Sequence, residues 1–153
     1  MHNPEINLFF LKEFLNVPAV NDKSRQKSFK QRTRQLVKNI LKKEELKCSY
    51  INLVFCDDEK IRDINREFLN HDYETDVLTF YDKDEDGLIE SDVIVSVDSV
   101  LENSKRYKTK FEDELNRVVA HGVLHLCGYN DDSRSDKIKM RKKENFYLNL
   151  FSH

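Results

Sequence analysis

Hydrophobic residues recur along the chain with two different periods, and these periods predict a mixture of helices and strands. In five segments apolar residues return every three or four positions, which is the spacing of one helix face. These segments are 23–43, 58–69, 99–108, 111–126 and 133–151. Shorter segments rich in β-branched and aromatic residues predict strands. These are 6–11, 49–57, 76–81 and 92–98. Because the strands do not alternate regularly with the helices, the pattern favours the α+β class.

The acidic segment between the last two predicted strands, residues 82–91, predicts a hairpin loop. Its start resembles a calcium-binding EF-hand loop, because carboxylates occupy the first, third and fifth positions and Gly87 occupies the sixth. The resemblance then fails. The twelfth position requires a bidentate Glu and is Val93, and the flanking segments are predicted strands where the motif needs helices. We therefore expect a solvated hairpin without calcium.

The length and composition predict a single domain that spans residues 1–153 and has one core. Hydrophobic residues make up 39% of the chain and charged residues 35%, and a formal net charge of -2 provides no general attraction to nucleic acid or membrane. No apolar run is long enough to span a membrane and the N-terminus lacks a secretory signal, so we expect a cytoplasmic protein. The three cysteines, an odd number with no C-x-x-C pair, predict reduced and mostly buried thiols.

Two histidines, His121 and His125, stand four residues apart in the predicted helix 111–126, so their imidazoles lie on one face. Gly128 is placed to end this helix and turn the chain back, which makes Asp131 the natural third ligand of a metal ion. Two imidazole nitrogens and one carboxylate leave coordination positions open for water, as in catalytic rather than structural sites. From these residues alone, an ordinary pair of hydrogen-bonded histidines remains an alternative.

Two neighbouring residues narrow the chemistry of this candidate site. Zinc peptidases with the motif H-E-x-x-H need a Glu directly after the first histidine as general base, and here that position is Gly122. Peptide hydrolysis is therefore not favoured. Cys127 follows His125 by two residues, about 200° around the helix, so it points away from the imidazoles and is expected to be a packing residue.

Three segments carry a resemblance to a known family. They are INREFLNHDYETDVLTF (64–80), SDVIVS (91–96) and ELNRVVAHGVLHLCGYND (114–131). Together they resemble the YbeY family of bacterial endoribonucleases, which are also called ribosomal RNA maturation factors. The resemblance extends from about Lys47 to the C-terminal helix, and the family signature H-G-x-L-H-L-x-G-Y-D-H differs only in its last two places. There the chain has Asn130 and Asp131, so the family's third histidine ligand corresponds to Asp131.

A further departure from the family concerns contact with RNA. The family usually carries an arginine at the position that corresponds to Leu69, and Arg66, one helical turn earlier, is the candidate replacement. The predicted helix 23–43 has nine basic residues and no acidic one, so its solvent face is another candidate RNA-binding surface. A shorter basic stretch follows at 137–144. The candidates on the long helix are Arg32, Arg34 and Lys38.

The resemblance implies an α+β fold in which helices pack a small mixed β-sheet and a zincin-like helix and turn hold the metal. It implies a metal-dependent endoribonuclease with His121, His125 and Asp131 as catalytic and metal-binding residues. The implied cofactor is one Zn²⁺ per chain, and another divalent metal is an alternative because the third ligand is an Asp. The expected partners are ribosomal RNA and the small ribosomal subunit, with no membrane and no DNA.

Two alternative functions are consistent with the same residues. The first is a ribosome-assembly or RNA-binding module whose metal is structural, and the missing family arginine at Leu69 favours it. The second is an iron site of oxygenase type, because two histidines and one carboxylate are the usual ligands of non-haem iron. Those ligands normally lie on strands of a barrel rather than on one helix and its following turn, so the iron hypothesis ranks last.

Overall fold

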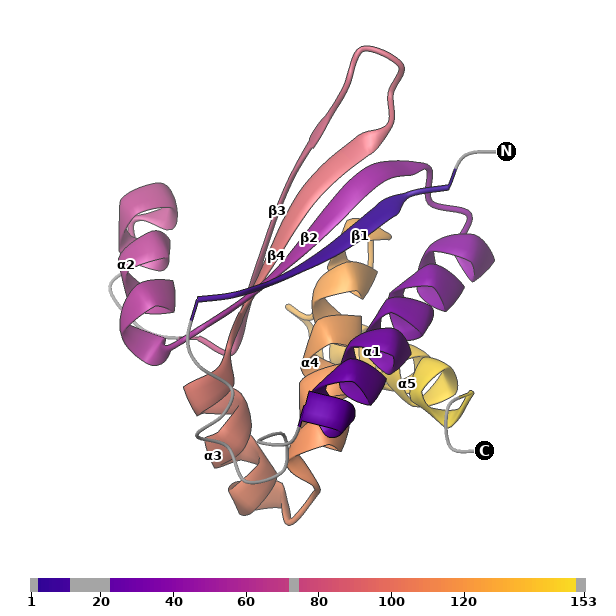
Figure 1. The fold of residues 1–153 in the computed structure, drawn as a ribbon. Coiled ribbons are helices and arrows are strands. Elements are labelled where there is room, and N and C mark those ends of the chain that lie inside the picture. The colour runs from indigo at the N-terminus through magenta and orange to yellow at the C-terminus, as the bar shows by residue number, and fades with distance from the viewer. Residues whose placement is uncertain (1–2, 12–22, 72–74, 151–153) are drawn as a thin grey trace.

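The structure is a computed structural model that describes residues 3–11, 23–71 and 75–150 (Figure 1). In chain order its elements are β1 (Glu5–Phe10), α1 (Lys23–Lys43), β2 (Cys48–Cys56), α2 (Asp58–Leu69), β3 (Val77–Lys83), β4 (Ile89–Ser96), α3 (Val97–Tyr107), α4 (Phe111–Leu126) and α5 (Arg134–Asn149). Every predicted element is present and the α+β class is confirmed. The predicted end of the last helix, at residue 151, lies outside the described residues.

The four strands form one mixed sheet in the order β1-β2-β4-β3. β1, β2 and β4 are parallel, and β3 pairs antiparallel with β4. In the middle of the sheet Leu53 of β2 lies between Leu8 of β1 and Val93 of β4. β1 and β2 are connected through α1, because parallel neighbours require a crossover, whereas β3 and β4 form a hairpin. The small mixed sheet implied by the resemblance is confirmed.

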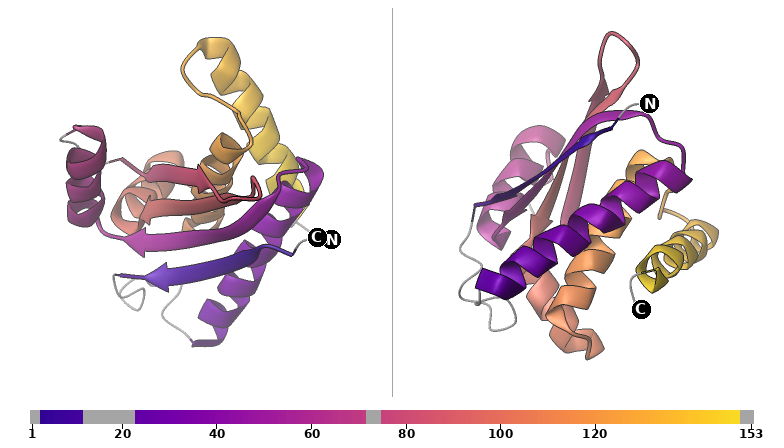
Figure 2. Two further views of the ribbon diagram at one scale, coloured as in Figure 1. Left: turned by 90° about the horizontal axis from the view of Figure 1, so that it is seen from above. Right: turned by 45° about the vertical axis from the view of Figure 1, so that its right-hand side comes forward.

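The main hydrophobic core lies on the face of the sheet that α1 and α4 cover (Figures 1 and 2). Fully buried residues of β2 and β4, such as Leu53 and Val93, meet the apolar stripes of both helices there. α5 packs in turn against α4 and α1. The other face carries α2, which covers a smaller cluster formed by Cys56, Ile61 and Ile94. The two faces of the sheet are therefore covered unequally by helices, and α4 lies at the centre of the larger helical layer.

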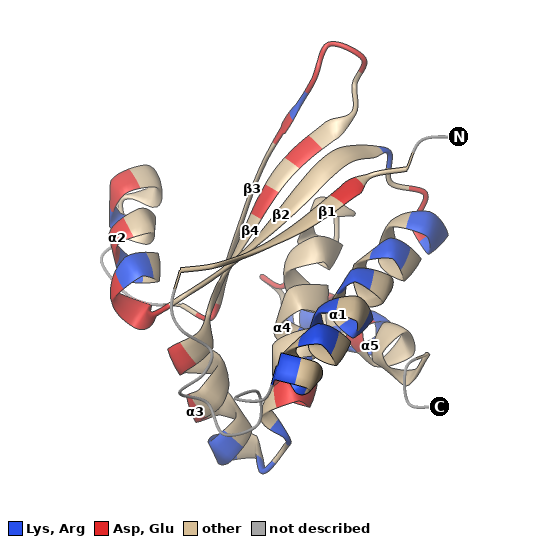
Figure 3. Cartoon of the chain, viewed as in Figure 1, with Lys and Arg blue, Asp and Glu red and all other residues tan. Residues whose placement is uncertain are grey.

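α1 is amphipathic, with basic residues on its exposed side and an apolar stripe on the other. Figure 3 shows Lys and Arg along its outer face. The buried residues recur at helical spacing. They are Phe29, Thr33, Leu36, Val37, Ile40 and Leu41. The helix predicted over 23–43 is confirmed with the same bounds. None of the described helices, α1 included, is long and apolar enough to cross a membrane.

The boundary between β4 and α3 differs from the prediction. The pattern predicted a strand up to residue 98, but the strand ends at Ser96 and Val97 already belongs to α3. The reason is the side chain of Ser96, whose hydroxyl accepts a hydrogen bond from the backbone N–H of Ser99 and caps the helix. Val97 has the β-branched side chain that strands favour, but the cap decides its conformation.

The acidic hairpin is shorter than predicted because both strands extend into the segment 82–91. Asp84 Oδ1 accepts hydrogen bonds from the backbone N–H groups of Asp86 and Leu88, both at 2.9 Å. Gly87 has a φ of 80°, in the left-handed region that favours glycine. A carboxylate of the EF-hand-like sequence thus stabilises the turn, and the flanking elements are strands, as the hairpin prediction required.

α4 lies so close to the sheet that only glycine fits at position 122. A Cβ atom on Gly122 would stand 2.7 Å from Val93 Cγ1 and 2.9 Å from Val77 Cγ2. The hydroxyl of Thr79 also donates a hydrogen bond to the carbonyl oxygen of Gly122 at 3.0 Å. Because Gly122 stands between the two histidines in sequence, these contacts with β3 and β4 fix the height of the histidine-bearing helix above the sheet.

The three cysteines are free thiols, as predicted. Cys48 and Cys56 are buried and Cys127 is half-buried. Burial raises the pKa of Cys48 to about 11 and the pKa values of Cys56 and Cys127 to about 12. These thiols are therefore protonated near neutral pH, and Cys127 packs against the core rather than joining the histidines.

Candidate metal centre

The three predicted ligands come from the end of α4 and the turn that follows it. His121 and His125 lie on the last turns of α4, and Gly128 follows with a φ of 96°, in the left-handed region. The backbone N–H groups of Gly128 and Tyr129 donate to carbonyl oxygens of the last helical turn at 3.1 and 3.2 Å and close the helix end. The predicted reversal at Gly128 is confirmed, and it brings Asp131 back to the histidines.

The three side chains converge on one point. The Nε2 atoms of His121 and His125 are 3.0 Å apart, and Asp131 Oδ2 lies 3.1 Å from the first and 3.6 Å from the second. A tetrahedral zinc ion with bonds of about 2.0–2.1 Å to nitrogen holds its ligand atoms roughly 3.3 Å apart. The three separations therefore match one face of such a tetrahedron. Among the described residues, no other group of three or more His, Cys, Asp and Glu side chains converges in this way.

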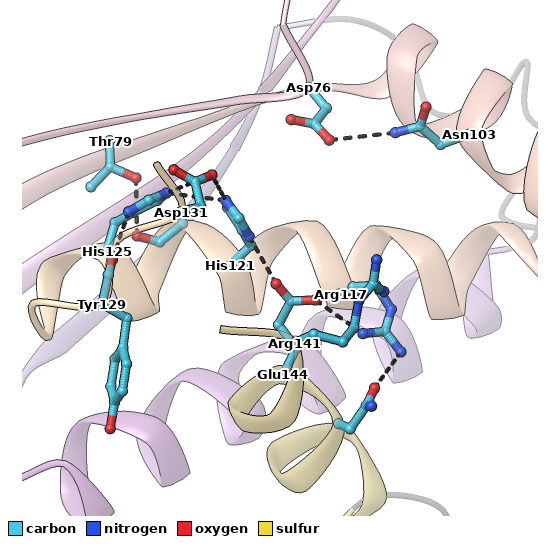
Figure 4. A network of polar contacts seen from close by, with 12 residues as sticks. Asp76, Thr79, Asn103, Arg117, His121, His125, Tyr129, Asp131, Arg141 and Glu144 are labelled. Carbon is cyan, nitrogen blue, oxygen red and sulfur yellow. Dashed lines mark hydrogen bonds and ion pairs between the residues drawn. The ribbon is translucent and has the colours of Figure 1, made fainter. Parts of the chain in front are cut away.

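Each imidazole has a second partner that fixes which nitrogen faces the site (Figure 4). Nδ1 of His121 lies 2.8 Å from Glu144 Oε2, and Nδ1 of His125 lies 2.9 Å from the carbonyl oxygen of Tyr129. A carboxylate and a carbonyl only accept hydrogen bonds, so both Nδ1 atoms carry the proton and both Nε2 atoms present lone pairs. Two lone pairs and the carboxylate of Asp131 repel one another unless a metal ion or a proton lies among them. The donor set therefore fits a divalent metal.

The surroundings of His121 favour positive charge. Burial alone would lower the pKa of its imidazole, but the hydrogen bond and charge of Glu144, with further contributions from Asp131 and Asp76, raise that pKa above its usual value. For Glu144, burial would raise the pKa, but hydrogen bonds from His121 and Arg117 lower it, so the carboxylate is ionised. An environment that draws a proton to His121 also draws a metal ion.

Glu144 belongs to the candidate site through its contact with His121, and the sequence motifs did not reveal it. It lies on α5, is 4% exposed, and accepts a hydrogen bond from Arg117 on Oε1 at 3.0 Å while Oε2 contacts His121. Arg117 also donates to Asn145 Oδ1 at 2.9 Å. The sequence did hold a signal, because Glu144 falls within the apolar stripe of its helix, and a charged residue in such a stripe needs a buried partner.

A second polar cluster supports the turn that follows α4. Glu44, just after α1, accepts hydrogen bonds from the hydroxyls of Tyr129 at 2.7 Å and of Tyr147, and from Lys143 Nζ at 3.1 Å. Burial would raise the pKa of Glu44, but these hydrogen bonds lower it, so the acceptor is charged. Because the carbonyl oxygen of Tyr129 also holds the ring of His125, the cluster connects α1 and α5 to the candidate metal site.

A pocket of about 310 Å³ lies beside the ligands. Its walls come from α3, α4 and α5, and His121 and Asp131 form part of its surface. Asp76 lines the same space, with Oδ2 accepting a hydrogen bond from the Asn103 amide at 3.4 Å, and burial raises the pKa of its carboxyl group. A group bound in this pocket would lie next to the candidate metal ligands.

The structure does not bring the basic face of α1 to the metal ligands. α1 packs against α4 through Arg32, whose Nη1 lies 3.3 Å from Glu112 Oε1, and through Thr33, whose hydroxyl donates to Asn116 Oδ1 at 3.0 Å. Glu112 and Asn116 precede His121 and His125 by nine residues each, which is 180° around an α-helix. α1 therefore lies on the side of α4 opposite the site.

The other candidate RNA-binding residues differ in their contacts within the protein and in their exposure. Arg34 Nε donates to the carbonyl oxygen of Ile6 at 3.2 Å, and Lys38 is exposed. Arg66 forms an ion pair of 2.7 Å with Asp63 on α2. Leu69, at the place of the family arginine, is 42% exposed. Contact of these residues with RNA stays a prediction.

The fold and the site together define an α+β protein in which a helix and its following turn present three residues suited to a catalytic metal ion. Comparison with known proteins agrees with this class. The family described as Endoribonuclease YbeY matches residues 19–152. The chain belongs to this family.

Individual relatives support the assignment. An Endoribonuclease YbeY of Cytophaga hutchinsonii is 39% identical over 146 residues, which cover 95% of this chain and 96% of the relative. One of Flavobacterium johnsoniae is 45% identical over 112 residues, covering 73% of this chain and 80% of the relative. A Thermotoga maritima protein solved in solution is 26% identical and superimposes with a TM-score of 0.62 over 94% of this chain and 86% of its own. The relatives thus share both sequence and fold with most of the chain.

Proposed function

We propose that the protein is a metal-dependent endoribonuclease that hydrolyses RNA phosphodiesters in ribosomal RNA processing and small-subunit maturation in the cytoplasm. Membership of the YbeY family supports the RNA endonuclease activity. The observation that carries the metal dependence is the convergence of His121 Nε2, His125 Nε2 and Asp131 Oδ2, at separations of 3.0, 3.1 and 3.6 Å. A divalent cation among lone pairs so close to one another would be bound favourably, and the open coordination positions suit hydrolysis.

One Zn²⁺ per chain is the proposed cofactor, held by His121, His125 and Asp131. A metal ion at this place lowers the pKa of a bound water and polarises a phosphoryl oxygen. The protein's own residues prepare the site, since Glu144 and the Tyr129 carbonyl orient the two imidazoles. Because the third ligand is a carboxylate, another divalent ion is the alternative, and metal analysis decides between them.

Metal analysis and an RNA cleavage assay test the proposal together. Protein purified without a histidine tag should hold about one equivalent of divalent metal per chain and cleave RNA in a chelator-sensitive manner. His121→Ala should abolish cleavage and keep RNA binding, because the ion performs the chemistry while basic surfaces hold the RNA. Pure wild-type protein that cleaves no RNA, either with or without added metal, would contradict the proposal.

The basic face of α1 is proposed to hold RNA at a distance from the metal. Its place on the far side of α4 suits contact with a remote part of a large RNA. Reversing the charges of Arg32, Arg34 and Lys38 together should weaken RNA binding and flatten its salt dependence by about 0.7 in slope per lost contact with a single strand. Lys38→Glu alone is the cleaner variant, because Arg32 pairs with Glu112 and Arg34 with a backbone carbonyl. Metal content should not change in either variant.

A second candidate function is an RNA-binding module for ribosome assembly, in which the metal is structural. It is favoured by the exposed Leu69 at the place of the family arginine and by the ion pair that occupies Arg66. In such a module, metal removal should lower thermal stability and RNA affinity together, with no chelator-sensitive cleavage to lose. The cleavage assay described above therefore separates the two functions.

A further inference from the structure

We propose that the free edge of β3 docks an extended segment of another protein, which adds to the sheet as a further strand and presents an apolar and a basic side chain to the face that carries α2. The proposal concerns a surface that takes no part in the proposed cleavage chemistry. It follows from three features of β3: unpaired backbone groups, an exposed aromatic pair and an acidic end.

β3 lies at the edge of the sheet and pairs with β4 alone. Two backbone hydrogen bonds define the alternation of this pair. Ser96 N–H donates to the Asp76 carbonyl at 2.9 Å, and Asp84 N–H donates to the Leu88 carbonyl at 2.8 Å. In an antiparallel pair, hydrogen-bonded residues alternate with residues whose backbone groups point outward. The even-numbered residues of β3 therefore bond to β4, and the odd-numbered ones direct their N–H and C=O groups away from it.

The outward groups at the middle of β3 belong to Thr79 and Tyr81. No hydrogen bond occupies these N–H and C=O groups within the part of the chain that the structure describes. At the end of the strand, the N–H of Lys83 donates to Asp82 Oδ1 at 2.8 Å instead. Proteins usually protect an edge strand by shortness, a proline or a bulge. β3 has seven residues in unbroken register and no proline, so its edge is a template for another strand.

The same edge lies beside the candidate metal centre. The hydroxyl of Thr79 donates to the carbonyl oxygen of Gly122 on α4 at 3.0 Å, and Figure 4 shows Thr79 beside His125. A docked strand would therefore flank the candidate ligands, and the protein that carries it would lie next to any RNA held there.

An exposed aromatic pair offers the added strand an apolar contact. Phe80 packs on the face of the sheet that α2 covers and meets Phe68 edge to face, with ring centroids 6.0 Å apart. Phe68 is 66% exposed and Leu69 beside it is 42% exposed. A residue directly opposite Phe80 on a neighbouring strand has its side chain on the same face. An apolar side chain there would cover part of these exposed rings.

Two residues further along β3 the same face becomes acidic. Asp82 stands directly opposite Glu90 of β4, and like charges in such a pair destabilise a sheet. No Lys or Arg forms an ion pair with either carboxylate among the described residues. The hairpin continues with Asp84, Glu85 and Asp86, and Figure 3 shows this acidic tip. A lysine or arginine opposite Asp82 would relieve the repulsion, so the added strand carries a basic residue there.

Charge also separates this partner from two other occupants of the edge. RNA would bring phosphate groups to the acidic hairpin and be repelled. A second copy of the chain, paired antiparallel about Phe80, would set Asp82 opposite Leu78 and Asp84 opposite Asp76. Neither carboxylate would gain a cation, and one pair would be of like charge. The edge therefore suits a basic extended segment of a different protein.

A synthetic peptide tests the added strand. The probe is Lys-Thr-Lys-Thr-Ile-Thr-Val, which in antiparallel pairing sets its isoleucine opposite Phe80 and its second lysine opposite Asp82. Titration of the isotope-labelled, full-length protein, followed by NMR, should shift the amide signals of Thr79 and Tyr81 most, with saturation. The same peptide with both lysines replaced by glutamate should bind roughly fivefold or more weakly.

The backbone of the peptide provides a matched control. The N–H groups of the threonines opposite Thr79 and Tyr81 point at β3, whereas the N–H of the isoleucine points away. N-methylation of those threonines should weaken binding by about fivefold for each lost hydrogen bond. N-methylation of the isoleucine should leave the affinity unchanged.

Variants of the protein test the same contacts from the other side. Tyr81→Pro removes an outward N–H without removing a bond to β4, which edge strands tolerate, and should weaken peptide binding at least about fivefold. Tyr81→Thr keeps the N–H and should bind like the wild type. Asp82→Asn still accepts the N–H of Lys83 and should weaken binding roughly two- to fivefold. Asp113→Asn removes the same charge at the start of α4 and should have no effect.

Three results would overturn the proposal. The first is a set of peptide-induced shifts that does not centre on Thr79 and Tyr81. The second is unchanged affinity after N-methylation of the two threonines. The third is a wild-type dimer that Tyr81→Pro converts to a monomer, because a second copy would then cover the edge. None of these measurements involves RNA cleavage, so failure of the endoribonuclease function would leave the docking site standing.

Discussion

Replacing Glu144 by glutamine removes the charge behind His121 while keeping the shape of the side chain. In the wild type, His121 Nδ1 lies 2.8 Å from Glu144 Oε2. In Glu144→Gln the amide oxygen can still accept this hydrogen bond, but the imidazole ring loses its anionic partner. Groups that hold a metal-binding histidine typically contribute roughly 10- to 100-fold to metal affinity, or about 1.4–2.7 kcal/mol. Glu144 is 4% exposed, so solvent screens its charge little, and we expect the upper half of this range, about 30- to 100-fold.

The zinc dissociation constant of this variant is measurable by competition with a chromophoric chelator, and the stability of the metal-free protein by thermal unfolding. The substitution also weakens the ion pair of Glu144 with Arg117, so a control must separate this effect. Asn145→Ala removes another contact of Arg117 and leaves His121 untouched. Since Asn145 is exposed, it should cost about 1 kcal/mol of stability or less, with zinc affinity unchanged.

Two results would refute this reasoning. The first is a folded Glu144→Gln protein that binds zinc within about twofold of the wild type, since a charged partner of a ligating histidine should matter more than that. The second is an equal loss of zinc affinity in Asn145→Ala. That result would attribute the effect to Arg117 rather than to the negative charge of Glu144 beside His121.

Three further predictions follow from the site and its helix. His125→Ala should lose the metal, because two ligands rarely hold an ion, whereas Asp131→His should keep or tighten zinc binding, as metal analysis of the purified variants will show. Gly122→Ala should lower the melting temperature in calorimetry, because its Cβ would stand 2.7 Å from a valine methyl on the sheet, and overpacking of roughly 1–3 kcal/mol outweighs a helix-propensity gain of about 1 kcal/mol. In the folded state, burial lowers the pKa of His121, but the hydrogen bond and charge of Glu144 raise it by more, so the pKa lies above its usual value. Its contribution to the stability of the metal-free protein is therefore fully present below the unfolded pKa of a histidine and lost as pH rises through the raised folded pKa. Thermal melts across neutral pH should show this loss in the wild type and not in His121→Gln.

The convergence of the three candidate ligands could be predicted from the sequence because a local rule connects each one to the next. The helical period places His121 and His125 on one face, and a glycine that adopts the left-handed conformation returns the chain to them at Asp131. Glu144 follows no such rule. It is 23 residues from His121 and reaches it only because α5 packs on α4, which is a tertiary contact that no short pattern encodes.

The place of α1 shows the same limit at the level of the fold. Its basic residues predict a solvent-exposed face, and the structure confirms one. They do not indicate which side of α4 the helix covers, because that depends on pairings such as Thr33 with Asn116 across 83 residues. Where an element boundary differs from its prediction, the reason is local instead. At Ser96, a helix cap overrides the strand preference of Val97.

Glu44 contacts two segments that the ribosome synthesises much later than Glu44 itself. Its carboxylate stands just after α1 and binds Tyr129 in the ligand turn and Tyr147 near the end of α5. A nascent chain exposes the histidine pair first, and two candidate ligands alone would hold an ion weakly. The turn that presents Asp131 gains its full support only when α5 has been synthesised and has docked. For the proposed metal site, tight uptake is therefore expected only once the chain is complete, and a polypeptide that stops before α5 should carry the candidate ligands without the support that retains an ion.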